Sequence, residues 1–362
     1  MKEPVYAAAG NRYDCGMQYR RAGKSGILLP AVSLGLWHNF GDVDTLSLSQ
    51  KKIHYAFDHG VTHFDLANNY GPSYGSAEET FGCIMQRSMA PYRDELFIST
   101  KAGHDMWEGP YGIWNSRKHL MASLDQSLKR MKLDYVDIFY SHRYDPETPL
   151  EETLQALTDI VRQGKALYVG LSKYPKEQLE IAYRFLKENR TPCLLYQGRY
   201  SLLDQAVEKE GILEESAAQG SGFVAFSPLA QGLLSDRYLN GIPEDSRIAR
   251  GGYLKKEALT DKVLSQIKAL NQVALRRNQT LAEMSLAWLL QDSRVTSVII
   301  GASSVEQLKD NLNALSNIAS KQGKGGGTFA HPMIGCEFAS WISPEFKMLL
   351  LKLSLNRERL KE

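Results

Sequence analysis

Residues 135–172 read YVDIFYSHRYDPETPLEETLQALTDIVRQGKALYVGLS. The stretch opens with a short apolar run that ends in YSHR, and it closes with a second apolar run, ALYVGLS. Between these runs, residues 150–165 have the spacing of an amphipathic helix. Near-continuous apolar runs are typical of strands buried on both faces, and a strand–helix–strand order is typical of parallel strands. The stretch therefore predicts one parallel β-α-β unit.

The same alternation extends in both directions along the chain. Strand-like runs are predicted at 31–37, 62–67, 95–103, 135–143, 166–172, 193–200, 222–230 and 295–303. Helical stretches are predicted at 48–60, 76–86, 116–133, 150–165, 175–189, 210–220, 261–277, 280–292 and 304–315. Ser76 and Glu79 have the pattern of a capping box. Eight such units in about 300 residues predict an α/β fold, a single (β/α)8 TIM barrel, with an N-terminal β-hairpin in residues 18–30 and a long loop after the seventh strand.

An open, doubly wound sheet is the alternative with the same alternation. No Gly-x-Gly-x-x-Gly follows a strand-like run, which weakens the dinucleotide-binding version of that fold. The barrel is expected to occupy residues 1–320, and residues 321–362 are expected to be a C-terminal tail. Within that tail, GKGGG at 323–327 is typical of a flexible linker. The last residues, 346–362, fit either an amphipathic helix or a poorly ordered end.

The composition is ordinary for a soluble globular protein. Of 362 residues, 43% are hydrophobic and 23% are charged, and the net charge of +2 favours neither nucleic acid nor a membrane surface. No apolar run reaches the length of about 18 residues that a membrane span needs, and no signal peptide is recognisable, so a cytoplasmic location is expected. Cys15, Cys83, Cys193 and Cys336 are far apart, so they predict neither a metal site nor disulfides, and each is expected to be a small buried side chain.

Polar and ionisable side chains gather at the ends of the predicted strands. Asp65 closes the second strand, Lys101 the third and His142 the fourth, while Tyr70 follows Asp65 in an Asn-Asn-Tyr-Gly turn. The later strands end at Ser172, at Gln197, in FSPLAQG (226–232) and in GAS (301–303). Because a (β/α)8 barrel builds its active site at the C-terminal ends of its strands, we expect these residues to share one mouth.

Asp65, Tyr70, Lys101 and His142, called the tetrad below, suit general acid–base chemistry. A lysine ammonium beside a phenol favours the phenolate, and moving the phenol pKa from about 10 to about 7 takes about 4 kcal/mol. Asp65 would hold Lys101 charged, Tyr70 would be the acid or base, and His142 would orient a substrate oxygen. Each residue alone also has a structural explanation, as an ion pair between strands or as a core histidine. Their shared position favours the catalytic interpretation.

Four longer segments carry a specific resemblance. SLGLWHNFG (33–41), FDLANNYGPSYGSAEE (64–79), STKAGHDMWEGPYG (99–112) and FSPLAQGLL (226–234) resemble, in this order, the aldo-keto reductase family. The resemblance implies a nicotinamide cofactor, expected to be NADPH, that gives hydride from C4 to a carbonyl carbon while Tyr70 donates the proton. It also implies a small aldehyde as substrate, with L-glyceraldehyde 3-phosphate first and methylglyoxal second.

The resemblance further assigns the contacts of cofactor and substrate. Ser172 and Gln197 would hold the carboxamide of the nicotinamide, and Phe226 would stack on its ring. The remaining cofactor contacts would be Ser227, Leu229 and Gln231 at the pyrophosphate, Arg237 and Arg247 at phosphates, Gly301, Ser303, Gln307 and Asn311 at the adenosine end, and Trp37 and Asp65. The substrate pocket would be formed by Trp37, His38, Tyr70, Trp107, His142 and Arg143.

Three positions bear on cofactor and substrate choice. Lys173 stands where many family members have asparagine, and Ala302 stands where many have a lysine that grips the 2′-phosphate of NADPH. Arg143 is a candidate cation for a substrate phosphate, and the alternative is an ion pair with Asp145 or Glu147.

A second function fits the same resemblance, namely a cofactor-sensing regulatory subunit similar to the β subunits of potassium channels. Those subunits carry asparagine at the position of His142, so the histidine favours an enzyme. The expected partners are a small aldehyde and further copies of the chain, in a tetrameric or octameric homo-oligomer. Nucleic acid, membrane and metal ions are not expected.

Overall fold

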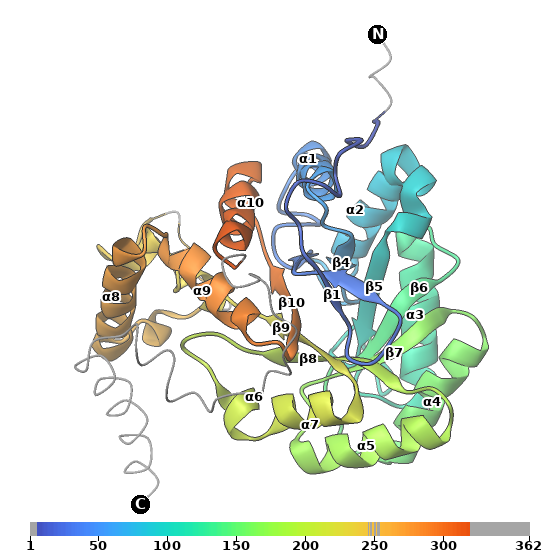
Figure 1. The fold of residues 1–362 in the computed structure, drawn as a ribbon. Helices are drawn as coiled ribbons and strands as arrows, with labels where there is room; N and C mark the ends of the chain where they lie inside the picture. Colours follow the sequence, from blue (N-terminus) through green and yellow to red (C-terminus); the bar gives the residue numbers. More distant parts are fainter. Residues whose placement is uncertain (1–5, 245, 247, 250, 252–253, 319–362) are drawn as a thin grey trace, which may run out of the picture. The chain divides into compact units, whose positions relative to one another are not determined.

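A computed structural model of the chain describes residues 6–318 except 245, 247, 250, 252 and 253 (Figure 1). Parallel strands form a closed barrel in the order β10-β3-β4-β5-β6-β7-β8-β9. The predicted (β/α)8 barrel is therefore confirmed. The barrel strands are β3 (Val32–Gly35), β4 (His63–Asp65), β5 (Phe97–Ala102), β6 (Val136–Ser141), β7 (Ala166–Ser172), β8 (Cys193–Arg199), β9 (Gly222–Phe226) and β10 (Val295–Ile300).

Amphipathic helices surround these strands (Figure 1). In α4, for example, Leu154, Leu157 and Ile160 recur at helical spacing and are buried. The helices are α1 (Leu46–Asp58), α2 (Ser76–Ile84), α3 (Arg117–Met131), α4 (Leu150–Arg162), α5 (Lys176–Glu188), α6 (Ala206–Lys209), α7 (Ile212–Gln219), α8 (Asp261–Arg276), α9 (Leu281–Gln291) and α10 (Val305–Leu312). A π turn, η1 (Met85–Met89), and 3-10 turns, η2 (Ala90–Glu95) and η6 (Asn313–Asn317), were not predicted.

The capping box predicted at Ser76 and Glu79 is wrong. Gly75 is the N-cap residue, in a left-handed conformation with φ 91°, so Ser76 already lies inside the first turn of α2. Its hydroxyl is buried and finds no hydrogen-bond partner within the described residues. A capping box does form at α9, where Thr280 and Glu283 bond reciprocally.

Two apolar layers stabilise the barrel. The larger layer lies between strands and helices, and a smaller cluster that includes Ile138, Tyr140, Leu195 and Val224 fills the barrel interior. Gly170 admits the Tyr140 ring, because a Cβ at position 170 would lie 2.3 Å from that ring. The barrel interior is therefore packed and is not an open pore.

The predicted N-terminal hairpin forms as β1 (Tyr19–Arg21) and β2 (Leu28–Pro30), which pair antiparallel. Ala22 and Leu29 of this hairpin pack into the interior cluster, and Lys24 donates its backbone N–H to Gly220 O at 2.9 Å. Since Gly220 lies two residues before β9 begins, this contact ties the hairpin to the N-terminal end of the barrel.

The predicted long loop follows β9 and runs from residue 227 to residue 260. It contains the short 3-10 turns η3 (Ala230–Gly232), η4 (Asp236–Tyr238) and η5 (Lys256–Ala258). Leu234 and Tyr238 of this loop are buried in a third apolar cluster with Ile267 of α8 and Met284 of α9. Arg247, Cys336 and the predicted tail at 321–362 lie outside the described residues.

Two of the cysteine predictions need correction. Cys15 and Cys83 are exposed, and only Cys193 among the described cysteines is buried. Cys83 lies on the outward face of α2, which the apolar pattern of that helix did not distinguish. No helix of the described residues is both long and apolar enough to cross a membrane, and the described residues hold no cluster of three or more potential metal ligands among His, Cys, Asp and Glu.

Candidate active site

The strand register brings the polar strand ends together at one mouth of the barrel. Asp65 of β4 pairs with Ser99 of β5, and Ser172 of β7 pairs with Gln197 of β8. Side chains alternate along a strand, so Ser99 and Lys101 both point into the barrel.

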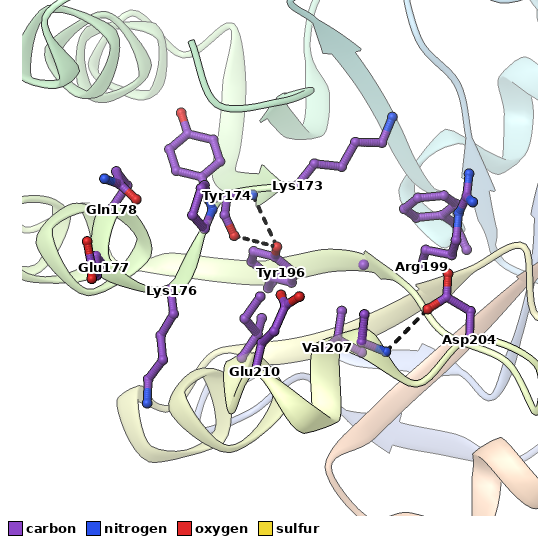
Figure 2. Close-up of a pocket in the computed structure, with 15 residues that line it drawn as sticks. Lys173, Tyr174, Lys176, Glu177, Gln178, Tyr196, Arg199, Asp204, Val207 and Glu210 are labelled. Atoms are coloured by element: carbon purple, nitrogen blue, oxygen red, sulfur yellow. Dashed lines mark hydrogen bonds between the residues drawn. The ribbon is translucent and has the colours of Figure 1, made fainter. Parts of the chain in front are cut away.

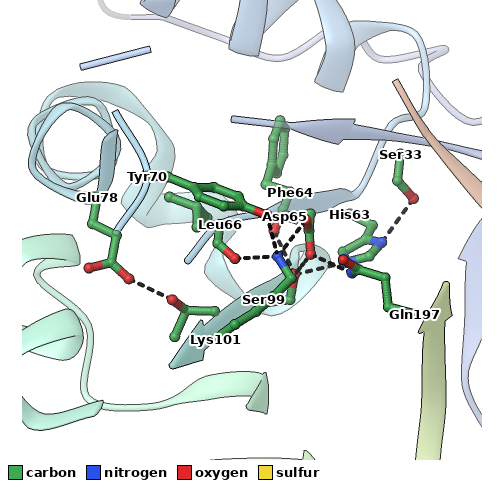
Figure 3. A network of polar contacts seen from close by, with 11 residues as sticks. Ser33, His63, Phe64, Asp65, Leu66, Tyr70, Glu78, Ser99, Lys101 and Gln197 are labelled. Atoms are coloured by element: carbon green, nitrogen blue, oxygen red, sulfur yellow. Dashed lines mark hydrogen bonds and ion pairs between the residues drawn. The ribbon is translucent and has the colours of Figure 1, made fainter. Parts of the chain in front are cut away.

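Asp65, Lys101 and Tyr70 form a continuous chain of contacts (Figure 3). The Lys101 ammonium is fully buried and lies 2.7 Å from Asp65 Oδ2, 2.6 Å from Leu66 O and 3.2 Å from the Tyr70 phenol oxygen. The other carboxylate oxygen of Asp65 accepts from Ser99 Oγ at 2.7 Å and from Gln197 Nε2 at 3.0 Å. Both carboxylate oxygens are therefore engaged, and the ammonium points at the phenol.

His142 completes the tetrad from the adjoining strand end. Its backbone N–H donates to Ala102 O at 2.9 Å, which places it directly after β6. Its ring meets the Tyr70 ring edge-on with centroids 5.8 Å apart, and it meets the His104 ring with centroids 4.5 Å apart. His142 Nδ1 is buried without a hydrogen-bond partner in the described part of the chain.

The electrostatics of the tetrad differ from the prediction in one respect. Burial raises the pKa of Tyr70 above its usual 10.0, and the opposing effect of Lys101 does not overcome it. The pKa of Tyr70 therefore does not move toward 7 in this structure, because burial disfavours the phenolate more than Lys101 favours it. The phenol keeps its proton at neutral pH.

The other titratable groups of the mouth follow from burial and from the surrounding cations. Burial would lower the pKa of Lys101, but Asp65 and Tyr70 outweigh it and the pKa is raised. Burial, Lys101 and further neighbouring charges hold the pKa of His142 well below 6.5. Burial and nearby cations likewise lower the pKa of His104 to about 4. The mouth therefore holds a charged lysine and neutral imidazoles.

Several residues assigned to a nicotinamide cofactor carry buried polar atoms that the protein itself does not satisfy. Ser172 Oγ, Gln231 Oε1 and Asn311 Nδ2 find no hydrogen-bond partner among the described residues. Buried polar groups are nearly always bonded, so these three atoms have hydrogen-bonding capacity left for a polar ligand. The donor and acceptor types of these residues fit the carboxamide, phosphates and adenosine of a dinucleotide.

The segment after β9 is strained where the pyrophosphate contacts are predicted. Ser227, Ala230 and Gln231 have φ values of 52°, 47° and 60°, a left-handed region that non-glycine residues rarely adopt. Lys173 after β7 and His38 after β3 share this conformation, with φ values of 54° and 63°. Strained backbone of this kind clusters at ligand sites, because the surrounding fold must hold it in place.

The predicted adenosine contacts are only partly brought together. Gln307 Oε1 accepts from the Ser303 backbone N–H at 2.8 Å and from its hydroxyl at 3.0 Å, so these two residues bond each other. Both are exposed, as is Gly301, whereas Asn311 is buried on α10. Arg237 lies on the exposed turn η4.

Two tryptophans of the predicted substrate wall, Trp37 and Trp107, pack on histidines, and Trp37 also lies near Tyr70. Trp37 lies against His38 with ring centroids 3.7 Å apart, and its centroid is 6.2 Å from that of Tyr70. Trp107 packs on His119 with ring centroids 4.8 Å apart, on the loop that follows β5.

Arg143 is held by contacts other than the ion pair considered above. Its Nε donates to Gly103 O at 3.0 Å, and its guanidinium lies 3.9 Å from the Trp114 ring centroid. Asp145 instead accepts from the backbone N–H groups of Asn115 at 2.9 Å and of Glu147 at 2.9 Å. Arg143 is therefore fixed beside the catalytic mouth.

A cavity of about 1000 Å³ opens at the ends of β7, β8 and β9 (Figure 2). Lys173 and Arg199 line one end of it, and Lys176 and Glu177 of α5 line the opposite end. Phe226 is also part of the lining. Lys173 Nζ lies 5.5 Å from the Phe226 ring centroid, and the Arg199 guanidinium carbon lies 5.9 Å from it. Two cations, Lys173 and Arg199, therefore lie beside Phe226, the residue expected to stack on the nicotinamide ring.

Comparison with known proteins decides the family. The model of the family described as "Aldo/keto reductase family" matches residues 31–322. The chain belongs to the aldo/keto reductase family. It is therefore an oxidoreductase, of a family that generally uses NAD(P)H.

Two curated relatives of this reductase are the L-glyceraldehyde 3-phosphate reductases of Escherichia coli K12 and of Escherichia coli O157:H7. Each is 55% identical to it over 318 residues, which cover 87% of this chain and 92% of the relative. Among solved structures, the thermostable aldo-keto reductase Tm1743, crystallised with the inhibitor epalrestat, is 31% identical. That match has a TM-score of 0.65 and covers 83% of this chain and 94% of the other.

Sequence reasoning missed three polar residues of the reductase that contact the tetrad directly or through one hydrogen bond. Ser99 bonds Asp65, His63 bonds Ser99, and His104 contacts His142. The spacing along the strands could have identified Ser99 and His63. His63 lies two residues before Asp65, and Ser99 lies two residues before Lys101, so each pair shares one strand face. His104 lies on a loop, and no periodicity marked it.

Proposed function

We propose that this reductase uses NADPH to reduce small aldehydes, with L-glyceraldehyde 3-phosphate as its leading substrate and methylglyoxal as a second, and that Tyr70 donates the proton. The observation that carries the proposal is the buried Asp65–Lys101–Tyr70 chain at the mouth. Residues 1–320 would be the catalytic unit, and the family match at 31–322 supports that assignment. The homo-oligomeric state and the cytoplasmic location stay predictions.

The contacts of the tetrad suit a proton donor. A bound nicotinamide would supply the hydride. Tyr70 holds its proton at neutral pH, and the ammonium 3.2 Å away stabilises negative charge as it develops on the phenol oxygen. Asp65 holds that ammonium in place by accepting its hydrogen bond at 2.7 Å. The neutral His142, beside the Tyr70 ring, would orient the carbonyl oxygen that receives the proton.

The cations of the mouth support a phosphorylated aldehyde. Lys101, Lys173 and Arg143 all act to lower the pKa of His142 and of His104, which means that their fields converge there. Lys101 is paired with Asp65, whereas Lys173 is partly exposed beside Phe226. An anionic substrate would relieve this mutual repulsion, and a guanidinium or ammonium is the usual partner of a phosphate. The names of the two relatives point to the same substrate.

The substrate claim is tested by NADPH oxidation with each enantiomer of glyceraldehyde 3-phosphate separately, beside methylglyoxal and an NADH control. We expect turnover that favours the L enantiomer and NADPH. Arg143→Ala should raise KM for the phosphorylated aldehyde about tenfold or more, the worth of one charged hydrogen bond, and should leave KM for methylglyoxal nearly unchanged. Equal effects on both aldehydes would remove Arg143 from the phosphate site. Tight NADPH binding without turnover of any aldehyde would favour the regulatory alternative.

A further inference from the structure

A second polar chain lies inside the barrel and ends on Asp65 of the tetrad, and Figure 3 shows its part from Ser33 to Asp65. Ser297 Oγ lies 2.6 Å from Ser33 Oγ, which lies 2.8 Å from His63 Nδ1. His63 Nε2 lies 3.2 Å from Ser99 Oγ, which lies 2.7 Å from Asp65 Oδ1. The chain therefore links strands β10, β3, β4 and β5 and ends on a tetrad carboxylate.

These side chains have no access to water. Ser33, His63, Ser99 and Ser297 are each 0% exposed, and Asp65 is 2% exposed. Polar groups at such a depth are costly unless every donor meets an acceptor. Apolar side chains fill the rest of the barrel interior, so apolar residues could have packed at these positions as well.

The carboxylate at the end of the chain sets the direction of every hydrogen bond in it. An ionised carboxylate only accepts, so the single Ser99 hydroxyl proton is directed to Asp65. His63 Nε2 must then donate to Ser99. A neutral imidazole has one donor and one acceptor, so His63 Nδ1 accepts from Ser33, and Ser33 accepts from Ser297. Burial supports the neutral form, because it lowers the pKa of His63 to about 4.

We propose that His63 is a positioning residue of this reductase, which donates from Nε2 to Ser99 and so commits the Ser99 proton to Asp65. Asp65 in turn holds Lys101 against Tyr70, so the inference rests on the roles proposed above for the tetrad. If His63 carried its proton on Nδ1 instead, Ser99 would donate to the histidine or to Phe64 O, 3.4 Å away. Among the described residues, Asp65 Oδ1 would then keep only Gln197 as a donor.

Two substitutions at position 63 separate this role from simple packing. The amide of His63→Gln can reach the place of Nε2 and donate to Ser99, whereas the shorter amide of His63→Asn reaches only the place of Nδ1. We expect His63→Gln to keep kcat within about threefold of the wild type. His63→Asn should lower kcat about tenfold or more, the worth of one hydrogen bond to a charged group, with little change in KM or in the Kd for NADPH.

Ser99→Ala tests the next link. It should lower kcat by about the same factor as His63→Asn, and the double variant should lose no more than either single variant, because both break one path. Tyr183→Phe is the matched control, since it removes a buried hydrogen bond of 2.9 Å to Ser216 on the outer layer. It should lower thermal stability and leave kcat unchanged. A His63→Asn enzyme with wild-type kcat would overturn the proposal, as would equal losses in the Gln and Asn variants.

A spectroscopic measurement on the wild-type protein tests the proposal without turnover data and without a variant that has to fold. In a protein labelled with ¹⁵N-histidine, His63 should give the pattern of a neutral ring protonated at Nε2, unchanged between mildly acidic and mildly basic pH. A ring protonated at Nδ1 would overturn the proposal. If the wild type does not reduce L-glyceraldehyde 3-phosphate, kinetics use another aldehyde that it reduces. If it reduces no aldehyde, the proposed function fails. The tautomer of His63 then still shows in which direction the hydrogen bonds between Ser297 and Asp65 run.

Discussion

Replacing Lys101 by methionine should disable the reductase by removing the charge that faces the Tyr70 phenol. The ammonium lies 3.2 Å from the phenol oxygen and is fully buried, so no solvent cation can take its place. Methionine keeps much of the stem volume of lysine and leaves the barrel interior filled. Its loss of charge is therefore the main perturbation.

The size of the effect follows from two distances. A unit charge 3.2 Å from the phenolate stabilises it by about 5 kcal/mol at an effective dielectric constant of about 20. The contact of 2.7 Å between Lys101 and Asp65 puts the carboxylate oxygen no farther than about 6 Å from the phenol, where it repels by about 3 kcal/mol. The ion pair thus contributes about 2 kcal/mol, or about thirtyfold in rate. If Asp65 stays ionised in the variant, the loss grows to about 5 kcal/mol, or several thousandfold.

The assay is kcat for an aldehyde at saturating NADPH, together with the free energy of unfolding. Asp65→Asn with Lys101→Met has no charge at either position and should lose only about thirtyfold in kcat. Arg93→Met is the stability control, because it breaks the contact of Arg93 with the buried Asp137, at 2.9 Å, at the start of β6 and so away from the mouth. This control variant should have a lower free energy of unfolding than the wild type and an unchanged kcat. A Lys101→Met enzyme within about threefold of the wild type would refute the electrostatic reasoning.

Two further predictions concern pH. Burial lowers the pKa of His63 from 6.5 to about 4, with Lys101 acting in the same direction and Asp65 against it. The unfolded chain therefore binds more protons in this range, and the free energy of unfolding should be highest above pH 6.5 and fall by up to about 3 kcal/mol toward pH 4. Denaturant unfolding at successive pH values should show a smaller fall in His63→Gln, and an equal fall would contradict the assignment. Burial and neighbouring cations lower the pKa of Lys173 to about 8. Lys173 therefore loses its positive charge above that pH, and KM for L-glyceraldehyde 3-phosphate should rise there. A Lys173→Met enzyme with the pH dependence of the wild type would exclude Lys173 from phosphate binding.

The barrel and the tetrad could be predicted from the sequence because each rests on a local pattern. The run that ends in Lys101 and the run that ends in His142 alternate with amphipathic helices, and that alternation allows few folds. Once the barrel is assumed, the strand ends must meet at one mouth. The register puts Asp65 and Lys101 on neighbouring strands at that mouth, and the short turn after Asp65 brings Tyr70 to the same place.

What could not be predicted depends on burial and on loop conformation. The pKa of Tyr70 is raised because desolvation outweighs the lysine, and the depth of a side chain is not visible in its neighbours along the chain. Arg143 stacks on Trp114 because the loop between β5 and α3 folds back over it. Ser76 fails as a cap because Gly75 takes a left-handed conformation just before it. Each of these depends on contacts that are distant in sequence or on a single backbone angle.

The most direct test of the account compares the wild type with Tyr70→Phe, which removes the hydroxyl and leaves the ring in place. NADPH oxidation with L-glyceraldehyde 3-phosphate and the Kd for NADPH are measured on both proteins. We predict an unchanged Kd and a loss of at least about a hundredfold in kcat, the usual contribution of general acid catalysis. A Tyr70→Phe enzyme that keeps its kcat would show that the proton comes from elsewhere and would contradict the central claim.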